Sequence, residues 1–325
     1  MHKLGESLQN YYLQGLAPST QKTYKSAKVR YLAFCNKAIT PPLPLSENVL
    51  CFYVSFLADE GLAHATIKSY LSACRHLHIS YGYPEPHIGD MPRLAQIMKG
   101  IKSSQAKQGR QPKPRLPITP PILIQIKTLL EKQPNNFNNI MLWAAYTTCF
   151  FGFLRAGEIC IPSDAGYDPG AHLSFSDIAV DNSLNPTLMQ VRIKASKTDP
   201  FRQGVDIYLG RTYNNLCPVA AMMAYLSARG DASGPLFRFQ DGKPLTRERL
   251  VGKLREALHC IGIRQDIYSG HSFRIGAATT AAQHGIPDAT IQLLGRWEST
   301  AYLLYVKIDR NKLASITTTL STPLK

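Results

Sequence analysis

Acidic residues, paired cysteines and long apolar runs are all scarce in this sequence, and each absence narrows the class of protein. The 325 residues include 22 Asp and Glu against 37 Lys and Arg, which gives a formal net charge of +15. Such an excess favours a polyanionic partner such as nucleic acid, although many soluble proteins are basic for solubility alone. With 44% apolar and 18% charged residues, the chain is typical of a globular protein rather than a disordered one.

No targeting, membrane or metal-binding pattern is present. Seven cysteines are scattered without a Cys-x-x-Cys pair, which suits a reducing compartment and argues against disulfides and structural zinc. His76 and His78 are two residues apart and would point to different faces of a helix. The most apolar run, Ile140 to Leu154, is too short to span a bilayer, and the first residues lack the apolar segment of a signal peptide. We therefore predict no cofactor, no metal and no membrane partner.

The first third of the chain is predicted to be helical and to end in a linker. Four helices are expected, over Gln21–Leu32, from Ser46 onward, over Ala65–Leu77 and over Met91–Lys102. The interval Ser103 to Pro117 contains prolines, lysines and arginines with almost nothing apolar, which indicates a linker. We therefore expect a helical domain over residues 1–108, a basic proline-rich linker over 109–117 and a second domain over 118–325.

The second domain is predicted to mix helices with a small sheet. An amphipathic helix is predicted to start within Pro120 to Leu130. One long apolar helix is predicted over Asn138 to Arg155. Ser176 to Tyr208 changes to an alternation of period two, which predicts a small antiparallel sheet. Helices resume at Pro218. The expected fold class is mainly α, with a helical N-terminal domain and an α+β second domain.

Six side chains match what a protein needs to cut a phosphodiester without a metal. A phenol can attack phosphorus once the phosphate charge is neutralised, and arginine matches two phosphate oxygens with a planar fork. An indole N–H can donate to a phosphate oxygen, a histidine can accept or donate a proton, and a lysine in a turn can protonate the leaving 5′ oxygen. The candidates are Arg155, Lys197, His271, Arg274, Trp297 and Tyr305.

Taken singly, each candidate is more simply explained by packing or by a solvated charge. Their joint pattern is harder to obtain by accident. Arg155 follows an apolar run with Glu158 three residues on, and His271 and Arg274 lie within Gly-His-Ser-Phe-Arg-Ile-Gly. Gly-Arg-Trp then places Tyr305 eight residues after its tryptophan. Lys197 lies between two predicted strands, with Lys194 as the alternative lysine of the same turn.

These motifs resemble those of the tyrosine recombinase (integrase) family, and most of all its eukaryotic members encoded by Crypton-like or DIRS-like mobile elements. The resemblance covers nearly the whole chain and is strongest from His271 to Tyr305. It implies a core-binding domain and a catalytic domain that close around duplex DNA, with four protomers at two sites and no metal. It implies that Tyr305 is the nucleophile of a 3′-phosphotyrosine intermediate. A DNA recombinase of this kind would act in the nucleus, or in the cytoplasm of a prokaryote.

Several alternatives stay open. Tyr302, five residues after Trp297, is a rival nucleophile. A type IB topoisomerase-like enzyme would use the same chemistry on one duplex, and a domesticated, non-catalytic DNA-binding protein would use none. An RNA-binding protein is disfavoured because no aromatic-rich strand motif is visible.

The basic excess is concentrated in the first third of the chain. Residues 1–115 carry 15 basic and 6 acidic side chains, whereas residues 116–325 carry 22 and 16. Helical spacing places the first lysines of this region on one side of a helix, where they could also be merely solvated. The predicted DNA-binding residues are Lys22, Lys25, Lys28, Lys68, Arg75 and Lys102.

Overall fold

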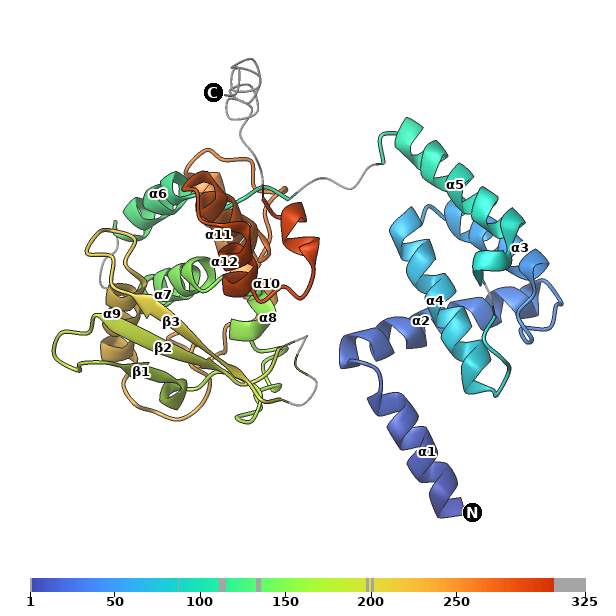
Figure 1. Cartoon of the computed structure of the whole chain (residues 1–325), viewed down its shortest axis with the longest axis horizontal. Helices are drawn as coiled ribbons and strands as arrows, with labels where there is room; N and C mark the ends of the chain where they lie inside the picture. Colours follow the sequence, from blue (N-terminus) through green and yellow to red (C-terminus); the bar gives the residue numbers. More distant parts are fainter. Residues whose placement is uncertain are drawn as a thin grey trace, which may run out of the picture. The chain divides into compact units, whose positions relative to one another are not determined.

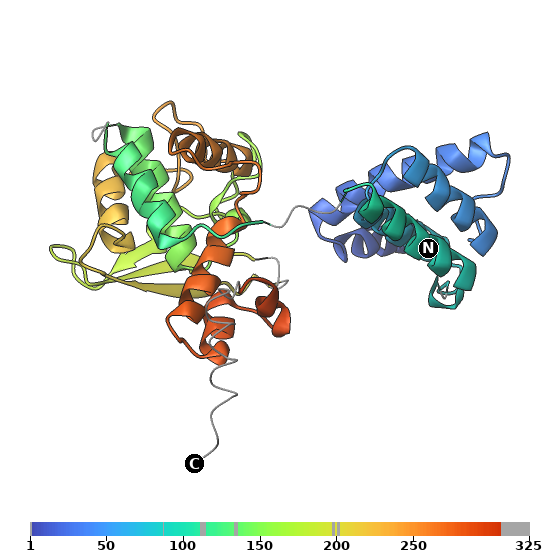
Figure 2. The same cartoon turned by 90° about the horizontal axis from the view of Figure 1, so that it is seen from above.

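The computed structural model of the chain describes residues 2–86, 88–110, 115–132, 136–196, 199 and 202–306 (Figures 1 and 2). Two compact units can be distinguished, Met1–Pro112 and Lys113–Lys325, and each has its own hydrophobic core. The point of division lies inside the interval 109–117. Among the described residues, no helix combines the length and apolar character that a membrane crossing requires.

The described part of the first unit is entirely helical. Ser46 caps α3 by accepting a hydrogen bond from the Val49 N–H at 3.3 Å, and α2 packs against α4 while α3 packs against α5. Tyr31 and Tyr53, both fully buried, lie at the centre of this core. The elements are α1 (His2–Gln14), α2 (Pro18–Lys37), α3 (Glu47–Asp59), α4 (His64–Ser80), the 3-10 turn η1 (Ile88–Asp90) and α5 (Pro92–Lys107).

Helix α5 runs further than the sequence indicates. The fourth helix was predicted to end at Lys102, but α5 continues to Lys107. Gln105 explains the extension, because its buried amide donates to the Leu62 carbonyl and accepts from the His64 N–H, each at 2.8 Å. These bonds satisfy backbone groups of the turn between α3 and α4, a tertiary contact that local composition does not reveal. Helix α1 was not predicted either.

The second unit combines helices with one small antiparallel sheet, so the predicted fold class is confirmed. Its strands pair antiparallel in the order β1-β2-β3, with Val191 opposite both Ile178 and Ile207. The sheet lies along one side of the unit, with α9 beside it (Figures 1 and 2). The elements are α6 (Pro120–Leu130), α7 (Phe137–Phe151), α8 (Ala156–Ile159), η2 (Phe175–Asp177), β1 (Ile178–Val180), β2 (Leu188–Ile193), β3 (Val205–Gly210), α9 (Pro218–Arg229), α10 (Arg247–Cys260), α11 (Ser272–Gln283), α12 (Asp288–Gly295) and η3 (Thr300–Leu304).

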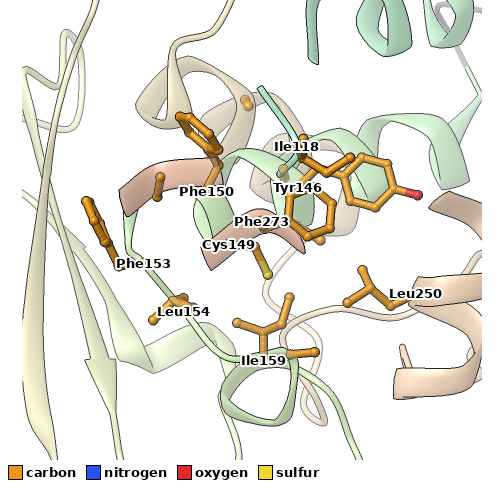
Figure 3. Close-up of a cluster of buried hydrophobic side chains, with 14 of the residues drawn as sticks. Ile118, Tyr146, Cys149, Phe150, Phe153, Leu154, Ile159, Leu250 and Phe273 are labelled. Carbon is orange, nitrogen blue, oxygen red and sulfur yellow. The ribbon is translucent and has the colours of Figure 1, made fainter. Parts of the chain in front are cut away.

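Helix α7 is the centre of the second core, because it packs against α6, α9 and α11. The rings of Tyr146 on α7 and Phe273 on α11 stack with centroids 5.2 Å apart, and Ile118 lies next to them (Figure 3). Gly276 lets α11 approach the segment before α6, since a Cβ there would lie 1.8 Å from the Ile118 carbonyl oxygen. These contacts fix the start of α11, where His271 is the N-cap residue and Arg274 lies in the first turn.

The apolar helix predicted over Asn138 to Arg155 ends earlier than expected. Helix α7 stops at Phe151, and Phe153 adopts a left-handed backbone with φ 51°. The side chains of Phe153 and Leu154 return to the core after this turn (Figure 3). Arg155 is therefore not at the end of a long helix but is the N-cap residue of the short helix α8.

Candidate active site

His271 and Tyr305 come together from distant parts of the sequence. His271 is the N-cap residue of α11, and Tyr305 directly follows η3. His271 Nε2 lies 2.8 Å from Tyr305 Oη, within hydrogen-bonding distance. Both side chains are half-buried, and their ring centroids are 5.1 Å apart. A hydroxyl with a proton acceptor at this distance is the arrangement that nucleophilic catalysis requires.

Glu158 holds two arginines beside this pair. Its Oε1 accepts a hydrogen bond from Arg155 Nη1 at 3.0 Å, and its Oε2 accepts one from Arg296 Nη2 at 2.8 Å. The backbone N–H of Arg155 also donates to Oε2, at 2.9 Å. The Glu158 side chain is only 3% exposed, whereas those of Arg155 and Arg296 are 23% and 17% exposed. One buried carboxylate therefore orients two guanidiniums that solvent can still reach.

Arg274 lies deeper, with its whole side chain buried. It comes from the first turn of α11, and its Nη1 and Nη2 donate to the backbone carbonyls of Phe153 and Gly295. Its Cζ lies 4.1 Å from the centroid of the Trp297 ring, a cation–π contact. The Nε of Arg274 is buried and has no hydrogen-bond partner among the described residues. The hydrogen bonding of this guanidinium is therefore incomplete within the described residues.

Trp297 covers Arg274. It is 8% exposed, and its ring contacts those of Phe153, Tyr302 and Tyr305 at centroid distances of 6.4, 6.2 and 5.3 Å. Gly295 makes the approach possible, because a Cβ at that position would lie 1.6 Å from Trp297 Cζ3. The contacts explain why a glycine precedes the Arg-Trp pair in the sequence.

The site has a net positive charge, because among the described residues one buried carboxylate, that of Glu158, lies beside three arginines. Burial, together with the charges of Arg155 and Arg296, lowers the pKa of Arg274 to about 9. Burial also lowers the pKa of Arg296, and Arg155 adds to that effect. Burial lowers the pKa of His271, with Arg274, Arg155 and Arg247 contributing, so the imidazole is neutral near pH 7. A bound anion would relieve the repulsion among these groups.

Of the two lysines of the predicted turn, the structure describes only Lys194. Lys197, expected to protonate the leaving group, lies outside the described residues. Lys194 Nζ forms an ion pair with Asp177 Oδ2 at 2.7 Å and donates to the Pro169 and His172 carbonyls at 2.8 and 3.3 Å. Because these bonds fasten Lys194 in place, it is a poor substitute for Lys197.

Tyr302, the rival nucleophile, belongs to the core. It is 7% exposed and packs against Trp297. Burial raises the pKa of its phenol, and a hydrogen bond with Asp288 raises it further. Tyr305, beside His271 and the arginine cluster, is the better placed of the two hydroxyls.

Glu158 and Arg296 are the site residues to which sequence analysis gave no role. Glu158 was visible as the acid three positions after Arg155, and Arg296 as the middle residue of Gly-Arg-Trp. Their importance depends on an ion pair between positions 138 residues apart, which no local motif predicts.

The basic residues predicted on α2 are not equivalent. Lys22 and Lys25 are exposed, as a DNA-binding surface requires. Lys28 is half-buried, and burial lowers the pKa of its amine. The accessible charge on α2 is therefore concentrated in its first two turns.

Two further predicted residues lie near each other across α4 and α5. Lys68 and Lys102 are exposed. Burial lowers the pKa of His64, and the charges of Lys102 and Lys68 lower it further. Arg75 forms an ion pair with Glu85, so its charge is already partly balanced. Lys68 and Lys102 are the stronger candidates for phosphate contacts on these helices.

Within the described ranges, no group of three or more His, Cys, Asp and Glu side chains is arranged to hold a metal ion. The chemistry that the described site itself offers comes from the histidine–tyrosine pair and the arginines. These groups suit nucleophilic attack on a phosphate whose charge the protein neutralises.

No protein-family model matches the chain. The integrase/recombinase xerD homolog of Selenomonas ruminantium is 22% identical over 295 residues, covering 87% of this chain and 79% of that protein. Recombinase cre of Escherichia phage P1 is 25% identical over 307 residues, covering 87% and 82%. The structure of XerH site-specific recombinase bound to palindromic difH substrate in a post-cleavage complex matches with a TM-score of 0.65 at 16% identity, covering 93% of this chain and 80% of that one. The fold is therefore shared with that protein.

Proposed function

We propose that this chain, a member of the tyrosine recombinase/integrase family, cuts and rejoins duplex DNA through a 3′-phosphotyrosine intermediate at Tyr305. The observation that carries the proposal is the 2.8 Å distance between His271 Nε2 and Tyr305 Oη, next to Arg155 and Arg274. The relatives named above are recombinases, and their similarity extends over most of this chain.

In the chemical step, the phosphorus exchanges its bond to the 5′ oxygen for a bond to Tyr305. Tyr305 Oη attacks the scissile phosphorus while the bond from phosphorus to the 5′ oxygen breaks. The phenolic proton passes to the neutral His271 Nε2, and the 5′ oxygen leaves with a proton from Lys197 or water. The 3′ end is then joined to the enzyme as a phosphodiester. Attack by a 5′ hydroxyl reverses these steps and rejoins DNA.

Arg155 and Arg274 are proposed to bind the non-bridging oxygens, where charge develops in the transition state. Arg155 is oriented by Glu158, and the unpaired Nε of Arg274 supplies a buried donor. Trp297 keeps its ring over Arg274 and so limits access of water to that guanidinium. Its indole N–H is a further proposed donor.

The resemblance of Gly-His-Ser-Phe-Arg-Ile-Gly and Gly-Arg-Trp to Crypton-like or DIRS-like recombinases supports a mobile-element origin. We propose on that basis that the protein recombines DNA in the nucleus, or in the cytoplasm if its source is prokaryotic. We also propose that four protomers assemble on two sites and that the basic first unit contributes duplex contacts. Light scattering of the protein with one-site and two-site DNA tests the tetramer.

Covalent trapping on a nicked suicide substrate tests the activity. Wild type should form a protein–DNA adduct in the presence of EDTA, and Tyr305→Phe should form none while binding DNA normally. Tyr302→Phe is the matched control, since it removes a neighbouring phenol oxygen, and it should still form the adduct. An adduct formed by Tyr305→Phe but not by Tyr302→Phe would reverse the assignment.

Relaxation of supercoiled DNA and strand exchange, measured beside adduct formation, separate the alternatives. A domesticated DNA-binding protein would bind the substrate and form no adduct in any variant. A topoisomerase-like enzyme would form the adduct and relax supercoiled DNA, yet exchange no strands between two sites. Strand exchange between two duplexes is the outcome that the proposed function requires.

A further inference from the structure

We propose that Arg296 is a third phosphate-binding arginine of the active site, held ready by Glu158. The proposal rests on the proposed function and names a binding residue that the sequence motifs leave unassigned. Three independent features of Arg296 support it: its backbone conformation, its hydrogen bonds and the charge around it.

The backbone at Arg296 is one that a side chain disfavours. Arg296 is the C-cap residue of α12 and has φ 54° and ψ 49°, in the left-handed region. Helices commonly place glycine at such a position because other residues are strained there. The glycine of this turn is instead at the adjacent position, Gly295, where a Cβ would clash with the Trp297 ring. An arginine at this position is therefore kept for its side chain.

The Arg296 guanidinium is oriented but not fully used. Its Nη2 donates to Glu158 Oε2 at 2.8 Å, and its Nη1 makes a long bond of 3.4 Å to the Gly152 carbonyl. Its Nε is buried without a hydrogen-bond partner in the described part of the chain, as is the Nε of the wholly buried Arg274. Two unpaired N–H donors thus belong to one cluster of cations, and tetrahedral phosphate oxygens would satisfy both.

The charge of the cluster also calls for an anion. Arg155 and Arg296 each take one oxygen of Glu158, so the third guanidinium, Arg274, has no carboxylate bonded to it among the described residues. A phosphodiester carries one negative charge and would bring the cluster closer to neutrality. The Glu158 ion pairs hold Arg155 and Arg296 in place before DNA arrives, which reduces the ordering cost on binding.

Arg296→Gly is the sharpest test because glycine suits the left-handed backbone. The variant should unfold near the wild-type temperature, because relief of the left-handed backbone offsets the lost ion pair with Glu158, yet it should cleave the suicide substrate roughly a hundredfold more slowly. With a methylphosphonate at the scissile position, which lacks the negative charge, the deficit should shrink to a few fold. Arg296→Lys should recover part of the rate on normal DNA.

Arg202→Gly is the matched control. Arg202 also has a left-handed backbone, with φ 52°, but its side chain is 64% exposed and pairs with Asp168 at 3.7 Å. It should cleave both substrates like wild type. An equal loss in Arg202→Gly, an unchanged rate in Arg296→Gly, or a deficit in Arg296→Gly that persists on methylphosphonate would each overturn the proposal.

A second measurement needs no cleavage. Inorganic phosphate, compared with sodium chloride at equal ionic strength, should raise the unfolding temperature of wild type and of Arg202→Gly more than that of Arg296→Gly. Equal shifts in all three proteins would overturn the role of Arg296. If wild type shows the phosphate effect but forms no DNA adduct, the proposed function fails while the anion site stands.

Discussion

At the scale of single residues, His271 links the geometry of the site to pH. Its ordinary pKa of 6.5 is lowered first by burial and then by Arg274, Arg155 and Arg247. The imidazole therefore stays neutral, and able to accept the Tyr305 proton, below pH 6.5. We predict that the single-turnover cleavage rate holds as pH falls through 6.5 and declines only as the lowered pKa is passed.

The control for this prediction is His271→Gln, which cannot titrate and should lose the acid limb along with most of the rate. The same shift affects stability. Because the unfolded chain binds the histidine proton more readily, folding free energy is lost as pH falls from 6.5 through the folded pKa, and His271→Gln should lessen that loss. A rate that already falls above pH 6.5 would contradict a neutral His271.

Substitutions of Trp297 can separate the contribution of its ring packing from that of its indole N–H. Its ring covers Arg274 at 4.1 Å and contacts three other aromatic rings. We predict that Trp297→Ala destabilises the fold by about 3 to 5 kcal/mol and nearly abolishes cleavage. Trp297→Phe keeps an aromatic face but lacks the proposed indole donor, so it should be nearly as stable as wild type in urea denaturation yet cleave about a hundredfold more slowly. Cleavage by Trp297→Phe within a few fold of wild type would mean that the indole N–H is not a phosphate donor.

At the scale of helices and strands, local pattern predicted the elements whose order depends on near neighbours. The cap of α3 at Ser46 and the alternation of β2 could both be predicted, since caps and period-two burial act over a few residues. The end of α7 was not, because the left-handed Phe153 is stabilised by a core formed from distant segments. Gln105 extended α5 for the same kind of reason.

The candidate site divides in a similar way. His271, Arg274 and Tyr305 stand in motifs, so the sequence could propose them together. Glu158 and Arg296 gain their meaning from an ion pair across 138 residues. Periodicity and spacing carry no information about such a contact, because it forms only after α8 and α12 have been packed in the same core.

The packing of α11 yields a prediction about stability. A Cβ on Gly276 would lie 1.8 Å from the Ile118 carbonyl oxygen, which is backbone and cannot rotate away. Gly276→Ala should therefore destabilise the protein by about 2 to 3 kcal/mol, measured by urea denaturation. Gly252→Ala in α10 is the matched control, since nothing lies within 4 Å of its added Cβ. It should be stabilised by about 1 kcal/mol, as expected for alanine in a helix interior.

A Gly276→Ala protein as stable as wild type would mean that α11 can move away from the segment before α6 without cost. Because His271 caps α11 and Arg274 lies in its first turn, cleavage should fall with stability in this variant and stay unchanged in Gly252→Ala. Loss of cleavage in both variants would instead point to a requirement for flexibility in α10.

For the whole molecule, charge is distributed unevenly between the two units. The first 115 residues hold 15 basic and 6 acidic side chains, an excess of 9, whereas the remainder holds 22 and 16, an excess of 6. The arginines of the site are few and partly buried. Affinity for the DNA backbone should therefore depend mainly on exposed lysines of the first unit, and chemistry on the second.

Salt dependence of DNA binding measures this division. Each phosphate neutralised contributes about 0.9 to the slope of log affinity against log salt. Lys22 and Lys25 are exposed, so replacing both with alanine in the full chain should lower the slope by about two, whereas adding Lys28→Ala should change it little because Lys28 is half-buried. Lys243→Ala with Lys253→Ala is the control, since these lysines pair with Asp241 at 3.0 Å and Glu256 at 2.7 Å. If replacing Lys22 and Lys25 leaves the slope unchanged, the DNA-binding surface lies elsewhere. Replacing Lys68 and Lys102 together should then lower the slope.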